Sequence, residues 1–445
     1  MASIPSISAN REEVNDCARA VEEMMKAAGV KTRVLRMNGA PPLLYGECKS
    51  SKSQKTVLFY NHYDVQPIEP LGEWRSPPFE PEIRDGRIYG RGVSDDKGEL
   101  VSRLKILESY VAADGEPPCN FKFCFDGEEE IGSPHLNEYL DENEAMFRAD
   151  ATFWEWGGVD EVGRPVVQLG VKGNLVLELY LRCLSSEAHG KTSAALPSAA
   201  WRMVHLLSKI RDERGRVLIP GWYDDVEKLT RAELEILNEE PFDPDQYLEN
   251  YGAQSFIANM TPMQAKVALA TKPTANISGL RSGYQGEGIK GIVPADALCK
   301  MNFQLVQNQD PNRLLTIFKE FLKDTTNEDV QILHHRGSPA ARTSPESPFA
   351  QACAEAGSKV YRKKSIIRLS ASGSGPLYMI AKRYRIPAVS VGVSAPDSGM
   401  HGPNENLRLD LLEKGILWIS ETIEHYVRID EPTWRRSSRR EGSLL

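Results

Sequence analysis

The order of apolar and polar positions along the chain predicts alternating strands and helices. Residues 97–110 carry leucines at helical spacing, with polar positions between them. The apolar runs are continuous rather than alternating, as expected for parallel strands that are buried on both faces. Four such runs lie at residues 56–60, 120–125, 151–154 and 388–393. The pattern therefore indicates an α/β fold with a largely parallel sheet.

The middle of the chain has a different pattern, in which strand-like stretches and helices follow one another in a fixed order. Strands are predicted at residues 174–183, 275–280, 298–306 and 330–334, and helices at 194–210 and 311–323. The order strand, helix, strand, strand, helix, strand is the split βαβ arrangement of a small two-layer domain. Residues 220–273 do not fit this order and are expected to form a helical insertion.

Two domains follow from these patterns. We predict one α/β domain with a mixed, mostly parallel sheet, made of residues 1–173 and 340–445. A smaller α+β (ferredoxin-like) domain, residues 174–339, is expected to interrupt it.

The composition of the chain indicates what class of protein it is and in which cellular compartment we expect it. Apolar residues make up 41% of the 445 positions, and we find no apolar run long enough to span a membrane. The N-terminus lacks the basic start and the hydrophobic stretch of a secretory signal. Seven scattered cysteines without a Cys-x-x-Cys pair argue against a disulfide framework and a thiolate metal site. We therefore expect a cytoplasmic protein without a membrane partner.

The net charge of −8 disfavours nucleic acid as a partner. The exception is the C-terminal tail, where Arg435, Arg436, Arg439 and Arg440 lie among serines. We interpret this tail as a disordered, solvated end.

Chemistry-bearing side chains follow the predicted strands. His62 and Asp64 follow the first, Asp126 to Glu130 the second, Glu155 the third and His401 the fourth, while Asp95 and Asp96 precede a helix. Ligands of open α/β sheets gather at the carboxyl ends of the strands. Taken singly, each group has an ordinary interpretation as a helix cap, a turn or a solvated face. Taken together, two imidazoles and several carboxylates suit two divalent ions such as zinc, cobalt or manganese, which share one carboxylate.

Four stretches resemble family twenty of the metallopeptidases. They are Asn61-His62-Tyr63-Asp64-Val65-Gln66-Pro67, Gly90-Arg91-Gly92 through Asp95-Asp96-Lys97-Gly98, Asp126-Gly127-Glu128-Glu129-Glu130-Ile131-Gly132-Ser133, and Met400-His401-Gly402-Pro403-Asn404-Glu405. The family includes carnosinase-type dipeptidases, peptidase T, carboxypeptidases, aminoacylase and succinyl-diaminopimelate desuccinylase. The chain is most similar to the dipeptidase branch. The resemblance implies a zinc-exopeptidase-like catalytic domain, with the inserted domain as a lid and dimerisation domain.

The resemblance also assigns the metal ligands. Asp95 would bridge two divalent ions, with Zn²⁺ as the expected metal and Mn²⁺ or Co²⁺ as the alternatives. His62 and Glu155 would complete one ion, and Glu129 and His401 the other. A metal-bridging hydroxide would attack the amide carbon.

Further roles follow from the same resemblance. Glu128 would act as the general base, and Asp64 would orient the His62 imidazole. His189, in Ser186-Glu187-Ala188-His189-Gly190, would reach into the partner's active site in a homodimer and stabilise the oxyanion. Backbone N–H groups of Ser372, Gly373, Ser374 and Gly375 would receive the substrate carboxylate.

One departure of this chain from the family's sequence pattern affects the expected substrate. Dipeptidase relatives usually carry an Arg-Leu-Val-Pro stretch whose arginine holds the substrate's terminal carboxylate, whereas this chain has Gln304-Leu305-Val306-Gln307. A glutamine cannot replace the charge of a guanidinium. Arg281 or Arg368 would have to substitute at this site, or the substrate lacks a free carboxylate.

Three functions remain open at this stage. The first is a metallo-dipeptidase or aminopeptidase that acts on small peptides. The second is an N-acyl amino acid deacylase, or another amidohydrolase, that uses the same metal site. The third is a non-catalytic metal-binding or partner-binding domain, which the retention of Glu128 and all five predicted ligands disfavours.

Overall fold

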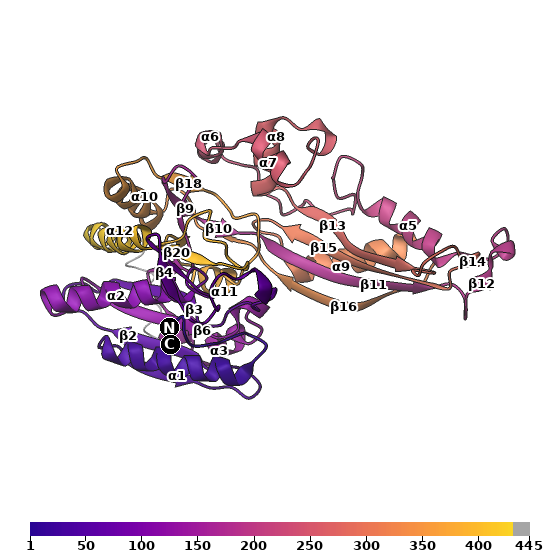
Figure 1. Cartoon of the computed structure of the whole chain (residues 1–445). Coiled ribbons are helices and arrows are strands. Elements are labelled where there is room, and N and C mark those ends of the chain that lie inside the picture. The colour runs from indigo at the N-terminus through magenta and orange to yellow at the C-terminus, as the bar shows by residue number, and fades with distance from the viewer. Residues whose placement is uncertain (430–445) are drawn as a thin grey trace. The chain divides into compact units, whose positions relative to one another are not determined.

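The computed structural model describes residues 1–429, which form two compact units (Figure 1). Unit 1 contains residues 1–169, 343–368 and the chain from Met379 onward. Unit 2 contains residues 170–342 and 369–378. The short segment 369–378 therefore belongs to unit 2, although it lies within the range predicted for the larger domain. The arginine-rich tail at 435–440 lies outside the described residues.

Unit 1 is built on a mixed nine-stranded sheet. Its strands run in the order β1 (Lys31–Leu35), β2 (Leu43–Cys48), β6 (Asn120–Asp126), β3 (Thr56–His62), β7 (Ala151–Trp154), β19 (Ala388–Ser390), β9 (Pro165–Gln168) and β18 (Ile366–Arg368), and β8 (Gly158–Val159) pairs with β9. The central pairs β6–β3, β3–β7 and β7–β19 are parallel, and β1–β2 and β2–β6 are antiparallel. The carboxyl ends of β3, β6 and β7 therefore meet at one edge, as ligand sites of open sheets require.

Helices cover both faces of this sheet (Figure 1). On one face, Tyr110 of α2 (Lys97–Asp114) packs against Phe121, and Phe349 of α10 (Pro348–Tyr361) packs against Phe153. On the other face, Phe147 of α4 (Glu144–Phe147) packs against Tyr45. Because both faces are buried, apolar residues predominate in the central strands, and Val57, Phe59 and Tyr60 have no exposed surface.

Further elements complete unit 1. They are α1 (Arg11–Ala27), α3 (Leu136–Glu142), α11 (Tyr378–Tyr384), α12 (Leu409–Arg428), and a small three-stranded sheet of β4 (Glu82–Arg84), β5 (Arg87–Tyr89) and β20 (Asn406–Arg408). Short 3-10 turns occur at Leu71–Glu73 (η1) and Glu129–Ile131 (η2).

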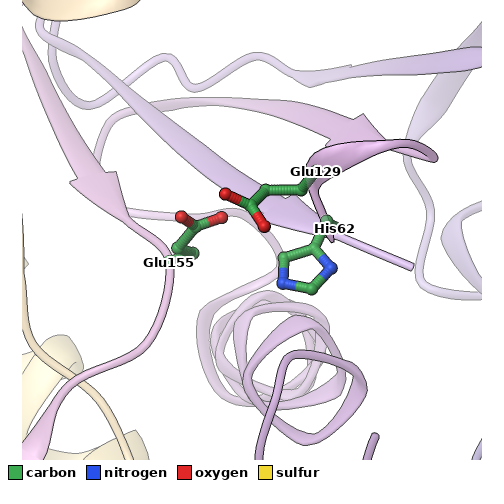
Figure 2. A group of neighbouring side chains, drawn as sticks. All are labelled: His62, Glu129 and Glu155. Atoms are coloured by element: carbon green, nitrogen blue, oxygen red, sulfur yellow. The ribbon is translucent and has the colours of Figure 1, made fainter. Parts of the chain in front are cut away.

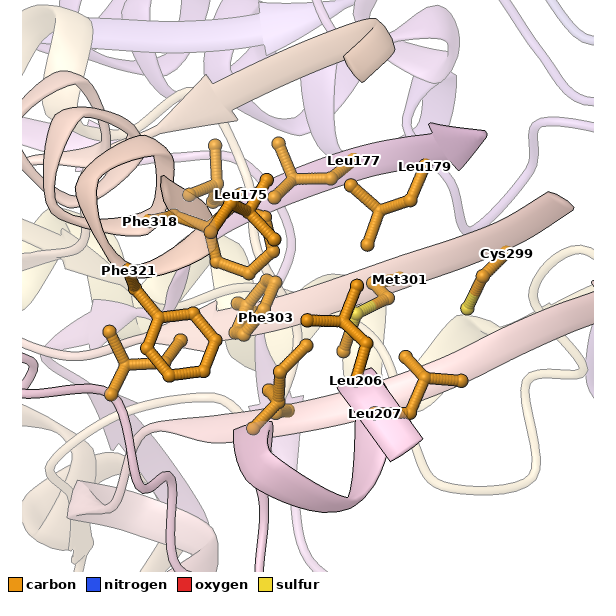
Figure 3. Close-up of a cluster of buried hydrophobic side chains, with 14 of the residues drawn as sticks. Leu175, Leu177, Leu179, Leu206, Leu207, Cys299, Met301, Phe303, Phe318 and Phe321 are labelled. Atoms are coloured by element: carbon orange, nitrogen blue, oxygen red, sulfur yellow. The ribbon is translucent and has the colours of Figure 1, made fainter. Parts of the chain in front are cut away.

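Unit 2 contains a four-stranded antiparallel sheet in the order β13 (Thr274–Ser282), β15 (Asp296–Leu305), β11 (Gly173–Arg182) and β16 (Val330–Ser338). Apolar side chains alternate along β11 and β15, so only one face of the sheet is buried. Helices α5 (Ala199–Ile210) and α9 (Pro311–Thr325) bury that face in a core that includes Phe303 and Phe318 (Figure 3). The α+β arrangement predicted for the middle of the chain is confirmed.

The expected helical insertion is also present in unit 2. It consists of α6 (Arg231–Glu239), α7 (Pro244–Asn250) and α8 (Pro262–Thr271), with a 3-10 turn at Ile257–Asn259 (η4) between α7 and α8. Capping boxes at Thr230 and Thr261 begin α6 and α8, so local sequence fixes where these helices start. The remaining short elements are β10 (Gly170–Val171), β17 (Ala341–Arg342), β12 (Ala188–His189), β14 (Ile292–Val293) and η3 (Gly190–Thr192).

Within residues 1–429, no helix has the length and apolar character needed to cross a membrane.

Candidate metal centre

Three ligand-type side chains meet where three parallel strands end. His62 is the last residue of β3, Glu129 follows β6 and Glu155 follows β7. Figure 2 shows the imidazole and the two carboxylates directed toward one another. One ligand atom from each lies within 4.8 Å of the others. The parallel register of β3, β6 and β7 produces this convergence.

Asp95 connects the two histidines. One of its carboxylate oxygens lies 3.1 Å from Nε2 of His62, and the other lies 2.9 Å from Nε2 of His401. These residues are 33 and 306 positions from Asp95 in sequence, so only the fold brings them together. An aspartate that offers one oxygen to each side has the geometry of a carboxylate shared by two ions. All five predicted metal ligands therefore belong to one cluster.

Within the glutamate triplet, the three side chains have different neighbours. The carboxylate beside His401 is that of Glu130, with 3.3 Å between its Oε2 and Nε2 of His401. The predicted pairing of Glu129 with His401 on one ion stays a prediction. Glu130 also groups with His62 and Asp95. Glu128, the predicted base, is in neither group of candidate ligands, and its carboxylate accepts hydrogen bonds from the backbone N–H and the imidazole of His135.

Asp64 orients both the imidazole of His62 and the 3-10 turn η2, which begins at Glu129. The backbone oxygen of Asp64 lies 3.0 Å from Nδ1 of His62, and its Oδ1 lies 3.3 Å from the same atom. This contact leaves Nε2 of His62 to face Asp95, as a metal-binding imidazole requires. The Asp64 carboxylate also accepts the backbone N–H groups of Glu129 and Glu130. One buried aspartate thus sets the orientation of His62 and the path of η2.

Glu405 is a site residue whose role the sequence analysis missed. It is fully buried, and its carboxylate accepts the backbone N–H groups of Gly92, Ser94 and Asp95. It also pairs with Arg91, which in turn donates to the backbone oxygen of His401. The available signal was its place four residues after His401 in a quoted motif. Glu405 and Arg91 therefore join the loop that carries Asp95 to the loop that carries His401.

Asp96 supports the cluster through hydrogen bonds to the last two residues of β3. Its Oδ2 accepts the backbone N–H of His62 at 3.0 Å and the side-chain amide of Asn61 at 2.8 Å. The Asp95–Asp96 peptide bond is cis. Burial raises the pKa of Asp96 to about 7.

Burial and hydrogen bonding raise the pKa values of several groups in the cluster. Burial, together with neighbouring carboxylates, raises the pKa of Glu129 to about 8 and that of Glu155 well above its usual value. Hydrogen bonds to Asp95 and Glu130 raise the pKa of His401 to about 10. Several acidic groups crowded out of water are costly to ionise unless a positive charge compensates them.

The residues present fit two divalent cations. Oε2 of Glu155 and Oε1 of Glu130 are buried and receive no hydrogen bond from any described residue. A buried acceptor without a partner needs an explanation, and an ion bound to it supplies one. The donor set of imidazole nitrogens and carboxylate oxygens, without thiolates, suits zinc, manganese or cobalt.

The other predicted residues belong to unit 2. His189 is exposed, and its Nδ1 accepts the backbone N–H of Lys191. Arg281 is an exposed residue of β13, and Gln304 lies on the neighbouring β15. The loop 372–375 is exposed for most of its length and contacts β11 through Ser374, which receives the side-chain amide of Asn174. The oxyanion role of His189 stays a prediction.

The protein is expected to be stabilised by metal more strongly at about pH 8 than at about pH 6. In the metal-free protein, the raised pKa values of Glu129 and His401 contribute stability that is present at low pH. That stability is lost as the pH rises from the usual values of 4.5 and 6.5 toward about 8 and 10. Metal binding requires the deprotonated ligands, so its contribution grows over the same range. Scanning calorimetry of the metal-free and the zinc-loaded protein measures the zinc-induced shift in Tm at each pH. An equal shift at the two pH values would contradict the prediction.

The fold and the site together define a metal-dependent hydrolase: a mixed α/β sheet whose strand ends hold two histidines and a group of carboxylates. Residues 58–425 match the Peptidase_M20 model, described as peptidase family M20/M25/M40, and the chain belongs to this family. The predicted family is thereby confirmed, and the enzyme is a metallopeptidase.

One solved structure and one sequence relative cover almost the whole chain, and a second sequence relative covers part of it. The M20 family metallo-carboxypeptidase Sso-CP2 from Sulfolobus solfataricus is 34% identical, with a TM-score of 0.87 over 96% of this chain and 98% of that one. The Cys-Gly metallodipeptidase dug1 of Schizosaccharomyces pombe is 27% identical over 93% of this chain and 91% of its own length. The human Beta-Ala-His dipeptidase is 27% identical over 61% of this chain and 54% of its own length.

Proposed function

We propose that this metallopeptidase hydrolyses the amide bond of dipeptide-like substrates at a two-metal centre. The observation that carries the proposal is the Asp95 carboxylate, whose two oxygens face His62 and His401 at 3.1 and 2.9 Å. The names of two relatives, a Cys-Gly metallodipeptidase and a Beta-Ala-His dipeptidase, support a dipeptide as the substrate.

The proposed ligand sets share Asp95. His62, Asp95 and Glu155 would hold one ion, and Asp95, Glu130 and His401 would hold the other. Glu155 suits a fixed ligand because it is buried and its Oε1 accepts a hydrogen bond from the indole of Trp154. Zinc is the ion that best fits this donor set, with manganese and cobalt as alternatives.

Glu129 is the proposed general base. When bound, the two ions would lower the pKa of a water and polarise the substrate carbonyl. The Glu129 carboxylate groups with His62 and Glu155, and Glu129 is half-buried whereas Glu155 is buried. A partly exposed carboxylate can take a proton from the attacking water and pass it to the leaving nitrogen. Glu130, the next residue, would bind metal, so of these two neighbours one would act as the base and the other as a ligand.

A substrate panel tests the proposed function. The zinc-loaded enzyme is expected to cleave dipeptides such as Cys-Gly and β-Ala-His faster than N-acetylated amino acids. Chelation should abolish turnover, and added zinc, manganese or cobalt should restore it. Faster turnover of the N-acetylated amino acids would favour a deacylase instead. Full activity in chelator would remove the two-metal account.

A further inference from the structure

A short segment ahead of α1, residues 4–8, runs beside the loop that follows β3. The backbone N–H of Val65 donates to the backbone oxygen of Ser6 at 2.9 Å, and the backbone N–H of Ser8 donates to that of Val65 at 3.1 Å. The hydroxyl of Ser6, which has no exposed surface, donates to the backbone oxygen of Tyr63 at 2.6 Å. Backbone and side-chain hydrogen bonds therefore join this segment to the loop after β3.

The first residue of α2 holds the same segment. Lys97 is only 1% exposed, and its ammonium group donates to the backbone oxygen of Ile4 at 2.6 Å. Lys97 comes directly after Asp95 and Asp96 in the sequence. Segment 4–8 therefore contacts two stretches that carry site residues, the loop after β3 and the start of α2.

Ser8 is the residue of this segment that contacts Asp64. Its hydroxyl lies 2.8 Å from Oδ2 of Asp64 and 3.2 Å from the backbone oxygen of Val65. A hydroxyl has one hydrogen to donate, and a carboxylate oxygen is a stronger acceptor than a neutral carbonyl oxygen. The shorter contact is also the one to the stronger acceptor, so the hydroxyl of Ser8 donates to Asp64.

Asp64 relays this contact to two predicted or proposed ligands. Its Oδ2 accepts the backbone N–H of Glu130 as well as the hydroxyl of Ser8, and its Oδ1 lies 3.3 Å from Nδ1 of His62. Within residues 1–429, removal of the hydroxyl leaves Oδ2 with one hydrogen bond, that from Glu130. Asp64 has no exposed surface, so bulk water does not replace the lost donor. The orientation of this carboxylate therefore depends on Ser8.

We propose that Ser8 is a positioning residue of the metal centre, which acts through Asp64 on His62 and Glu130. The proposal rests on the proposed function, because it assigns a role at the same two-metal site. Ser8 is not a ligand in this account. It holds one carboxylate, and that carboxylate holds the imidazole of His62 and the backbone of Glu130 in the positions in which they would bind metal.

The affinity for zinc, measured by competition with a coloured chelator, tests the proposal without turnover. Ser8→Ala should bind zinc about 10-fold more weakly than the wild type, the lower end of the effect of removing a group that orients a ligand, because Asp64 keeps its backbone donors. Ser8→Thr, which keeps the hydroxyl, should bind zinc within about threefold of the wild type.

Ser50→Ala is the matched control. Ser50 is also a half-buried serine of unit 1, and its hydroxyl donates to the backbone oxygen of Pro117 at 2.7 Å. The metal-free Ser8→Ala and Ser50→Ala proteins should both have a lowered Tm, since each loses the hydrogen bond of one hydroxyl. Only Ser8→Ala should lose zinc affinity. An equal loss of zinc affinity in Ser50→Ala would make the effect one of folding stability and overturn the proposal.

The visible spectrum of the cobalt-loaded protein reports on the geometry of the ligands. The absorption of bound Co²⁺ should change in Ser8→Ala and match that of the wild type in Ser8→Thr and Ser50→Ala. If Ser8→Thr loses as much zinc affinity as Ser8→Ala, the hydroxyl is not the group that matters and the proposal is wrong.

Dipeptide hydrolysis by the same preparations separates this proposal from the proposed function. If the wild type cleaves dipeptides but Ser8→Ala has the zinc affinity and the cobalt spectrum of the wild type, the role of Ser8 is wrong and the proposed function stands. If the wild type binds zinc without cleaving any dipeptide, and Ser8→Ala binds zinc more weakly, the proposed function fails and the role of Ser8 stands.

Discussion

Replacing Glu129 by glutamine is expected to lower kcat by about 10²- to 10⁴-fold while both ions stay bound. Glutamine has nearly the same shape as glutamate but cannot accept a proton and pass it on. The proposed ligands Asp95, Glu130 and His401 are unchanged in this variant, so its metal content should equal that of the wild type. Steady-state kinetics and elemental analysis of the same preparation measure the two quantities.

The neighbouring glutamate provides the matched control. Glu128→Gln removes a carboxylate that serves His135 rather than the metal cluster. Its kcat should fall by less than about tenfold, well below the range given for a lost general base. The reverse pattern, with Glu128→Gln inactive and Glu129→Gln active, would return the base to position 128.

Replacing Asp95 by asparagine is expected to remove metal and activity together. Asparagine offers one neutral oxygen where the aspartate offers two charged ones, so the two ions can no longer share it. The metal content should fall from two ions per chain to one or none. We expect kcat/KM to fall by at least about 100-fold, the upper end of the effect of removing a residue that only orients a ligand.

Asp397→Asn is the control for this change. Asp397 is an exposed carboxylate of unit 1 that pairs with Arg87 and takes no part in the cluster. Its variant should keep both ions and activity within about twofold of the wild type, as expected for exposed ion pairs. Retention of two ions and normal turnover in Asp95→Asn would exclude Asp95 as the shared ligand.

The sequence was sufficient to predict the central strands and the convergence of the ligands. Continuous apolar runs marked β3, β6 and β7, because strands buried on both faces have no polar side to interrupt the pattern. The strand predicted at 388–393 is shorter in the structure, since β19 ends at Ser390. Its remaining apolar residues are buried outside the strand: Val391 and Val393 have no exposed surface. Burial alone therefore does not distinguish a strand from the loop that follows it.

The register of the glutamate triplet could not be predicted. Three identical side chains in a row leave the sequence pattern unchanged when the assignment is moved by one position. The structure separates them through contacts with distant residues: Asp64 accepts the N–H groups of Glu129 and Glu130, and His135 takes the carboxylate of Glu128. Such contacts depend on how the backbone folds around the triplet. The sequence of the triplet itself contains no information about that fold.

The environment of Lys172, a residue of unit 2 that is only 2% exposed, could not be predicted for a similar reason. Lys172 follows a short apolar stretch and looks like an ordinary charged residue at a strand boundary. Its environment is set by the insertion, whose residue Lys272 lies 100 positions away in sequence and supplies the hydrogen-bond acceptor. Sequence reasoning found the insertion as a break in the pattern, but the cavity that it forms with β13 arises only from packing.

Anomalous diffraction from a crystal of the zinc-loaded protein tests the two-metal account most directly. The account predicts two zinc peaks about 3.5–4 Å apart, with one oxygen of Asp95 on each ion and with Glu130 and His401 on the same ion. A single peak, or two peaks with Asp95 bound to neither, would contradict it.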